Sequence, residues 1–368
     1  MTESSPLLDR PEDRVFISVD AMGGDRGPAV VVNGLNRAVW RNRKLRFLLF
    51  GDEETLRPLV ERRRLLRERC EIRHAAGVVT MDEKPSHVMR HGKGTSMWAA
   101  IEAVRDKEAT ACVSCGNTGA LMALSMIRLR KIQSVNRPAI ACLWPSRNRA
   151  GFNVMLDVGA DIRADTDDLI QYALMGASYA QIGLDLEKPR VGLLNVGTED
   201  HKGRTELREA DQELEASASF GGFEYVGFVE GNDIPTDKVD VIVTDGFTGN
   251  IALKTGEGTA KLIREFLSQA FKHSIASRIA AVFALTSLMR LARRIDPRRV
   301  NGGVFLGLNG TVVKSHGSAD ATGIAAAVKL AFDLGKADLP SELSRRLASL
   351  TNAGQSTAQA EQLYGNQK

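Results

Sequence analysis

The stretch ATACVSCGNTGALMALSMIRL, residues 109–129, places a short apolar run, a glycine turn and an apolar helix-like segment in direct succession. The run ATACVSCG has the length of a buried strand and is too short for a helix. The segment ALMALSMIRL has the apolar density of a helix that packs on a sheet. This order of strand, turn and helix is the repeating unit of a parallel sheet covered by helices.

Similar apolar runs recur along the chain, and most of them end in a polar or glycine-rich turn. They are VFISVD (15–20), RFLLFGD (46–52), FNVMLDVG (152–159), RVGLLNVG (190–197), FEYVGFVEG (223–231) and VDVIVTDG (239–246). Several are followed by amphipathic segments. The pattern predicts a doubly wound, mostly parallel α/β sandwich of Rossmann-like type.

Two connections are too short to contain a helix. PAIACLWP and FNVMLDVG are joined by the basic turn SRNRAG, and GVFLGL meets TVVKSHG across Asn309-Gly310. Both connections predict antiparallel hairpins, the second with a type I′ turn.

The chain shows no long linker and no internal repeat, so we expect one α/β domain over residues 15–345. Residues 1–14 are polar, mixed in charge and without an apolar signal-peptide core, and we expect a disordered tail and a cytoplasmic protein. Residues 346–368 read as a polar C-terminal tail. The four cysteines have no secreted-scaffold spacing, which favours reduced thiols over a metal or redox site.

Residues 271–299 form an appendage to this domain, because apolar residues are flanked there by arginines. The uncharged part is too short to span a bilayer, which takes about 20 apolar residues. An amphipathic helix or helical hairpin on an anionic membrane surface fits better, and a core or dimer helix with a solvated basic face is the alternative. The predicted membrane contacts are Ile279, Val282, Phe283, Leu288 and Met289.

The formal charge of +4 is too small to indicate nucleic-acid binding. Ligands of open parallel sheets bind outside the carboxyl ends of the strands, where helix N-termini present unpaired N–H groups. Five turns at those ends combine glycine with short polar side chains. They span Asp20–Asp25, Ser114–Gly119, Asp157–Asp161, Asn195–Gly203 and Asp245–Asn250.

Two of these turns, G-N-T-G and F-T-G-N, lead directly into predicted helices and suit an anion such as phosphate. For a single motif, helix capping is the more common explanation, whereas five such turns in one sheet favour a site. No dinucleotide-binding glycine motif, Walker A motif or H-E-x-x-H motif occurs, and no G-x-S-x-G elbow supports a serine acyl-enzyme. Direct attack by a bound nucleophile is the economical alternative.

The set of motifs resembles the PlsX-type phosphate acyltransferase family. The motifs V-D-A-M-G-G-D (19–25), S-C-G-N-T-G-A-L (114–121), L-D-V-G-A (156–160), N-V-G-T-E-D-H-K-G (195–203) and D-G-F-T-G-N (245–250) follow the family's order over nearly the whole chain. The resemblance implies a homodimer that moves a long fatty acyl group from acyl carrier protein to inorganic phosphate. It also implies no organic cofactor and loose attachment to the inner membrane.

We assign hypothetical roles to the residues of these motifs. The phosphate site is predicted at Gly116, Asn117, Thr118, Gly119, Thr248, Gly249 and Asn250. The catalytic candidates are Lys202, His201, His316 and Asn117, with Lys202 offsetting charge and either histidine protonating the thiolate. Further active-site turns supply Asp20, Gly23, Gly24, Asp25, Asp157, Gly159, Gly197, Gly203 and Asp245, whose aspartates are slightly more typical of turn-holding than of bases. Carrier-protein or pantetheine contacts are predicted at Arg90, Lys93 and Ser96. No metal site is predicted.

Three other functions stay open. A phosphotransacetylase that uses a coenzyme A thioester would need the same phosphate chemistry. An NAD-dependent β-decarboxylating dehydrogenase on a similar sandwich lacks an evident adenosine motif or carboxylate cluster here. A non-catalytic membrane-surface scaffold would use only the basic helix.

Overall fold

The computed structural model describes residues 15–294 and 302–348, which divide into two compact units. Unit 1 comprises the chain up to Arg130 together with Leu308–Pro340, and unit 2 comprises Lys131–Gly307 and the chain from Ser341. The predicted tails at 1–14 and 349–368 lie outside the described residues. A helix runs to residue 348 and buries Leu347, so it passes the predicted boundary at 345.

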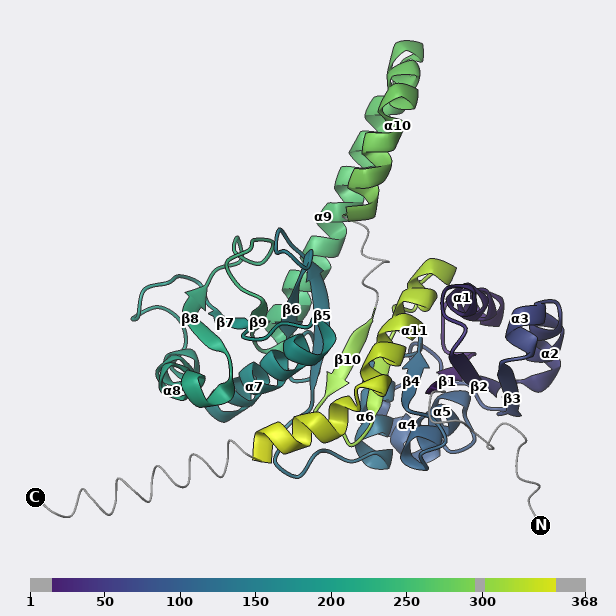
Figure 1. Cartoon of the computed structure of the whole chain (residues 1–368), viewed down its shortest axis with the longest axis horizontal. Helices are drawn as coiled ribbons and strands as arrows, with labels where there is room; N and C mark the ends of the chain where they lie inside the picture. Colours follow the sequence, from purple (N-terminus) through teal and green to yellow (C-terminus); the bar gives the residue numbers. More distant parts are fainter. Residues whose placement is uncertain (1–14, 295–301, 349–368) are drawn as a thin grey trace, which may run out of the picture. The chain divides into compact units, whose positions relative to one another are not determined.

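Unit 1 contains a fully parallel sheet in the order β3-β2-β1-β4-β11. These strands span Cys70–His74, Leu45–Gly51, Val15–Asp20, Ala111–Ser114 and Thr311–Lys314. Helices α1 and α11 cover one face and α5 and α6 the other (Figure 1). Their bounds are Pro28–Arg41, Ala321–Lys336, Ser96–Arg105 and Thr118–Arg128, and the smaller helices are α2 (Glu53–Glu61), α3 (Arg64–Arg67) and α4 (Pro85–His91).

Unit 2 contains strands in the order β10-β5-β6-β9-β7-β8. They span Gly303–Leu306, Ala139–Pro145, Phe152–Leu156, Val241–Val243, Arg190–Leu194 and Glu224–Val229. Strand β5 is antiparallel to both β10 and β6, and the remaining pairs are parallel. Helix α7 (Thr166–Gly183) packs on β6, β9 and β7 and against α8 (Thr205–Gly221).

Burial explains why continuous apolar runs form these strands. Every residue of β1 is buried, and Ile17 and Phe47 on neighbouring strands are completely inaccessible to solvent. Strands that are covered on both faces require apolar residues at every position instead of every second one. The predicted mixed α/β fold with a mostly parallel sheet is confirmed.

The first predicted hairpin is confirmed, and the turn type predicted for the second is wrong. Strands β5 and β6 form the first one, in which Trp144 lies opposite Asn153. The type I′ turn predicted at Asn309-Gly310 is wrong, because that turn requires positive φ at both residues and the connection has positive φ at Gly307 instead (φ 87°). Glycine at 307 takes up the left-handed conformation that a residue with a side chain would avoid.

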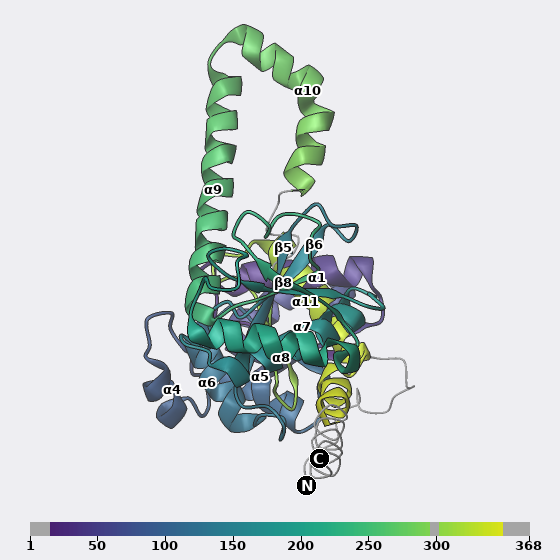
Figure 2. The ribbon, with the colours of Figure 1, turned by 90° about the vertical axis from the view of Figure 1, so that its left-hand side faces the viewer.

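The predicted helical appendage is a long hairpin of α9 (Gly246–Lys272) and α10 (Ile275–Arg294). The two arms extend away from the sheet of unit 2 (Figure 2). The first arm begins at Gly246, well before the predicted start at residue 271, because α9 continues without a break from the sheet to the tip. Within the described ranges no helix combines the length and apolar character needed to cross a bilayer.

Candidate functional site

Three strand ends meet in unit 1, because β1, β4 and β11 are neighbours in the sheet. The N–H of Asp25 donates to the carbonyl of Gly317 at 3.0 Å, and the N–H of Ser315 donates to that of Ser114 at 2.8 Å. A Cβ atom on Gly23 would lie 2.8 Å from the Cα of Gly116, so the first turn approaches the second as closely as only glycine permits. Two of the five predicted turns are therefore one cluster.

The buried carboxylate of Asp20 organises this cluster. It accepts hydrogen bonds from the hydroxyls of Ser96 and Ser114, both at 2.7 Å, and Ser114 accepts one from the N–H of Gly116 at 3.0 Å. Ser96 was predicted to contact the carrier protein or its pantetheine, and that contact stays a prediction. In the structure the Ser96 side chain is buried and bonded to Asp20, so it supports this turn.

Asn117 uses its whole side-chain amide within unit 1. Its oxygen caps helix α6 by accepting from the N–H of Ala120 at 3.0 Å. Its nitrogen donates to the carbonyls of Met81 and Glu83, at 2.8 and 3.0 Å. This asparagine positions the Gly116–Gly119 turn, and donation of a hydrogen bond from its side chain to a ligand would require one of the bonds to Met81 or Glu83 to break.

The third strand end of unit 1 carries Lys314 and His316. The Lys314 side chain is buried, and its ammonium group donates to the carbonyls of Cys115 and Ser315. His316 is exposed, and its Nδ1 lies 2.8 Å from the hydroxyl of Ser318. Burial raises the pKa of the Cys115 thiol to about 11, so this thiol is a neutral packing group at neutral pH.

The turns that follow β6 and β9 interlock in unit 2. The carboxylate of Asp157 accepts from the N–H groups of Ile140, Gly159, Ala160 and Asp161 at distances of 2.7 to 3.2 Å. Burial raises the pKa of Asp157, and these N–H groups partly offset that effect. The carbonyl of Asp161 then accepts from the N–H of Gly246 at 2.7 Å, which joins the two turns.

The start of α9 is fixed by three side chains. Asp245 caps the helix by accepting from the N–H of Thr248 at 2.7 Å, and the guanidinium of Arg204 pairs with the same carboxylate. The Asn250 amide donates to the carbonyl of Val158 at 3.1 Å. Asn250 and Asp245 therefore hold the turn together, while the hydroxyl-bearing Thr248 is exposed.

The loop after β7 brings Lys202 and His201 to the surface of unit 2. The Lys202 ammonium lies 2.7 Å from a carboxylate oxygen of Glu199, and the side chains are 41% and 50% exposed. His201 is also exposed. The Asn195 amide donates to the Lys202 carbonyl at 3.1 Å, next to Gly203 at φ 90°. Lys202 and Glu199 form a solvated ion pair, which contributes little stability. Another anion could therefore replace Glu199 as the partner of the ammonium group.

The predicted phosphate residues fall in both units, with Gly116–Gly119 in unit 1 and Thr248–Asn250 in unit 2. Their use as one cradle stays a prediction. Arg90 and Lys93 are exposed on and beside α4, as a protein contact requires.

Sequence reasoning missed Arg204 and gave Lys314 no role. A signal existed for Arg204, which directly follows the N-V-G-T-E-D-H-K-G run at the start of α8. A basic residue there can reach the cap of the neighbouring helix only if β7 and β9 are adjacent, and the chain order of these strands does not show that.

Known structures define the class of this fold. A phosphotransacetylase from Streptococcus pyogenes is 15% identical and superposes with a TM-score of 0.60, covering 88% of this chain and 95% of its own. A phosphotransacetylase from Staphylococcus aureus gives a TM-score of 0.55 at 14% identity, covering 88% of this chain and 94% of its own. Likeness at this identity establishes the fold alone.

Sequence comparison is more specific. A family described as "Fatty acid synthesis protein" matches residues 15–342, and the chain belongs to this family. A protein of Jannaschia sp. named "Phosphate acyltransferase" is 63% identical, covering 98% of this chain and 99% of its own. A protein of Paracoccus denitrificans with the same name is 64% identical, covering 97% of this chain and 95% of its own.

Proposed function

We propose that this enzyme transfers a long-chain fatty acyl group from acyl carrier protein to inorganic phosphate, forming an acyl phosphate for phospholipid synthesis. The names of the similar proteins support acyl transfer to phosphate. The observation that carries the proposal is the start of α9. Its glycine turn, the interlocked Asp157–Asp161 turn and two basic residues, Lys202 and Arg204, belong to three adjacent strand ends of unit 2.

Phosphate is a charged nucleophile at neutral pH, so the enzyme needs to position it and to remove its water. A phosphate oxygen attacks the thioester carbonyl carbon, and a new C–O bond forms. The carbonyl oxygen becomes an oxyanion that backbone N–H groups stabilise. The C–S bond then breaks, and the thiolate leaves with a proton from solvent or from His201 or His316.

The charge of Lys202 offsets the repulsion between phosphate and the carboxylates of the turns. In this proposal phosphate takes the place of Glu199 as the partner of the ammonium group. Thr248, exposed at the start of α9, supplies a hydroxyl donor to the anion.

The identity of the acyl donor is the more specific part of the proposal. Coenzyme A thioesters are the alternative, since the fold is also that of phosphotransacetylases. We would measure phosphate-dependent thiol release from palmitoyl carrier protein and palmitoyl coenzyme A at equal concentrations. A clear preference for the carrier protein supports the proposal, and equal or better use of coenzyme A contradicts it.

The exposed cations Arg90 and Lys93 are proposed to receive the acidic carrier protein. The hairpin of α9 and α10 is proposed both to pair two copies of the chain and to touch an anionic membrane from the cytoplasmic side. Ile279, Val282 and Phe283 support the second role, with 54%, 70% and 84% of their surfaces exposed. Leu288 is half-buried, and the side chain of Met289 lies outside the described residues.

A further inference from the structure

Each of the three ligand-side loops of unit 2 presents one large apolar side chain to solvent. They are Ile162 after β6, Val196 after β7 and Phe247 after β9, with 77%, 80% and 58% of their surfaces exposed. Their neighbours in sequence are polar or glycine, and those neighbours are the residues that build the anion-binding turns. The apolar side chains therefore interrupt a polar sequence on each of the three loops.

The hydrogen bonds and ion pairs of unit 2 hold these loops together. Ile162 and Phe247 directly follow Asp161 and Gly246, whose backbones are bonded at 2.7 Å. Arg163 pairs at 3.2 Å with Glu206 in the first turn of α8, just beyond the loop that carries Val196. Because β6, β9 and β7 are adjacent, their C-terminal loops lie along one edge of the sheet.

Exposed apolar side chains on adjacent loops can form one apolar surface, and such a surface beside polar residues is typical of a binding site. Folding does not explain them, because an exposed valine or phenylalanine gains no stability from burial. Ile251, one turn beyond Phe247 on α9, is also exposed and extends the apolar surface along the helix.

We propose that Ile162, Val196 and Phe247 bind the alkyl chain of the acyl donor, and this inference rests on the proposed function. The position of this apolar surface beside the proposed phosphate site favours an alkyl chain as its ligand. A thioester whose carbonyl meets phosphate at the start of α9 would bring its first methylene groups next to Phe247, which lies in the first turn of that helix. Covering each methylene from water is favourable by about 0.8 kcal/mol, so such contacts would give a preference for long chains.

The test compares palmitoyl and butyryl carrier protein as donors for Ile162→Ser, Val196→Ser and Phe247→Ser. Each variant is expected to lose about tenfold in kcat/KM for the palmitoyl donor and less than twofold for the butyryl donor. The KM for phosphate is expected to stay unchanged. Matched controls are Ile127→Ser and Val78→Ser, which remove exposed apolar side chains of unit 1 at 39% and 40% exposure.

An equal loss for both donors, or no loss for either, would overturn the alkyl-binding role.

A direct binding measurement separates this role from the proposed function. The fluorescence of cis-parinaric acid, an 18-carbon polyene fatty acid, should report binding to the wild type, and the triple variant should bind at least tenfold more weakly. Unchanged binding combined with dissociation of a dimer in sedimentation would assign these residues to a subunit interface and defeat the proposal. Absence of acyl phosphate from the wild type would defeat the proposed function while leaving the parinaric acid result to decide the alkyl site.

Discussion

Asn117 illustrates how one side chain serves two roles in the Gly116–Gly119 turn. Its oxygen caps α6 and its nitrogen holds the carbonyls of Met81 and Glu83. Serine caps a helix as well as asparagine does, but it is too short to reach both carbonyls.

Asn117→Ser and Asn117→Ala are therefore expected to raise the KM for phosphate about tenfold, because both release the turn. The alanine variant should have an unfolding free energy about 1 kcal/mol lower than the serine variant, because only alanine also removes the cap. Steady-state kinetics and urea denaturation measure the two effects. Unchanged phosphate kinetics in the folded variants would remove this turn from the phosphate site.

At the residue scale, local chemistry was predictable and long-range partners were not. Asp157 and Asp245 hold turns by bonding to nearby N–H groups, as aspartates beside glycine at strand ends predict. The partner of Ser96 is Asp20, which is 76 positions away along the chain. Such a partner follows from which strands are neighbours, and hydrophobic periodicity does not carry that information.

At the element scale, α9 approaches the Asp157 turn so closely that one of its glycines is required. A Cβ atom on Gly249 would lie 1.9 Å from the carbonyl oxygen of Asp157, whereas a Cβ on Gly258 of the same helix would meet open space.

Gly249→Ala is expected to cost several kcal/mol of stability or to prevent folding, since backbone must shift to admit the methyl group. The matched variant Gly258→Ala should instead stabilise the protein by up to about 1 kcal/mol, through helix propensity. Thermal unfolding measures both. A folded Gly249→Ala protein of wild-type stability would contradict the packing described for these turns.

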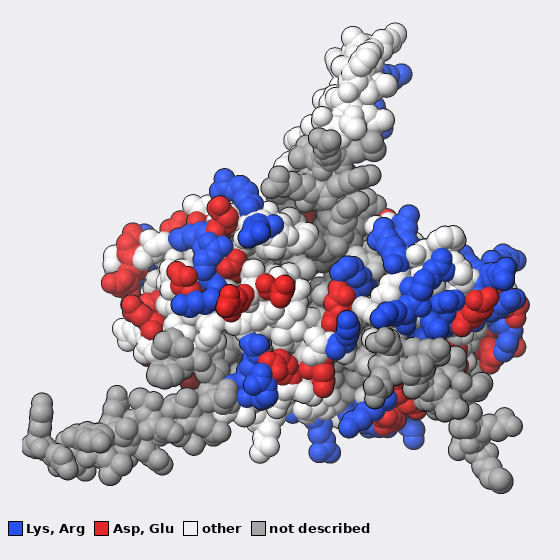
Figure 3. All heavy atoms as spheres, in the orientation of Figure 1, with Lys and Arg blue, Asp and Glu red and all other residues white. Residues whose placement is uncertain are grey.

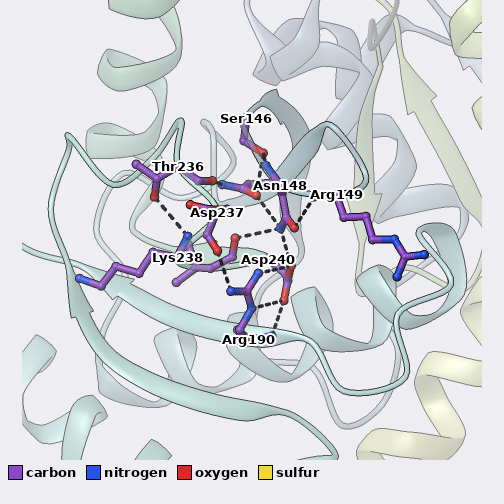
Figure 4. A network of polar contacts seen from close by, with 10 residues as sticks. Ser146, Asn148, Arg149, Arg190, Thr236, Asp237, Lys238 and Asp240 are labelled. Atoms are coloured by element: carbon purple, nitrogen blue, oxygen red, sulfur yellow. Dashed lines mark hydrogen bonds and ion pairs between the residues drawn. The ribbon is translucent and has the colours of Figure 1, made fainter.

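The second feature at this scale is a set of hydrogen bonds to Asp240, which connects the amino ends of strands in unit 2. Asp240 precedes β9 and accepts from the backbone N–H of Arg190 at 2.8 Å and from its guanidinium at 3.0 Å, as well as from the Asn148 amide (Figure 4). Burial acts to raise the pKa of Asp240, but these hydrogen bonds outweigh it, so the pKa lies below its ordinary value.

Asp240→Asn is expected to lose about 2 kcal/mol of unfolding free energy at pH 7, where the wild-type carboxylate is fully charged. A lowered folded-state pKa contributes stability that is present above about pH 4 and is lost as the pH falls through the folded value. The difference between wild type and variant should therefore shrink below pH 4 in urea titrations. Asp237→Asn, on the exposed neighbour, is the control and should change little at any pH. A difference for Asp240→Asn that is constant from pH 7 to pH 3 would refute the ion-pair account.

The elements themselves were largely predictable, because continuous apolar runs and glycine turns are local features. The type I′ turn at Asn309-Gly310 was wrong since the left-handed residue of that connection is Gly307. The start of the hairpin was placed too late because α9 changes from a ligand-side turn to an exposed arm without any break in helical sequence.

At the scale of the whole molecule, the chain passes from one unit to the other after Arg130, after Gly307 and after Pro340. None of these points has the composition of a linker, so the sequence pattern contains no signal for the division. Figure 3 shows mostly uncharged side chains at the tip of the α9 and α10 hairpin, with Lys and Arg atoms along one side. Over the part of unit 1 that contains α1, α2 and α3, it shows many Lys and Arg side chains with some Asp and Glu among them.

Val282→Glu and Phe283→Glu are expected to abolish sedimentation of the protein with anionic liposomes, because each places a charge where apolar surface meets the bilayer. Both side chains are exposed, so folding and soluble activity should persist. Thr286→Glu, on an exposed polar residue of the same helix, adds the same charge without removing apolar surface and should bind more than the other two variants. Undiminished sedimentation of Val282→Glu would place the membrane contact elsewhere.

The central claim is that bound phosphate attacks an acyl thioester directly. The most direct measurement incubates the purified protein with palmitoyl carrier protein, with and without phosphate, and traps the product with hydroxylamine. We predict palmitoyl hydroxamate in proportion to enzyme and only when phosphate is present. Thioester loss without hydroxamate, or hydroxamate formation independent of phosphate, would contradict the account.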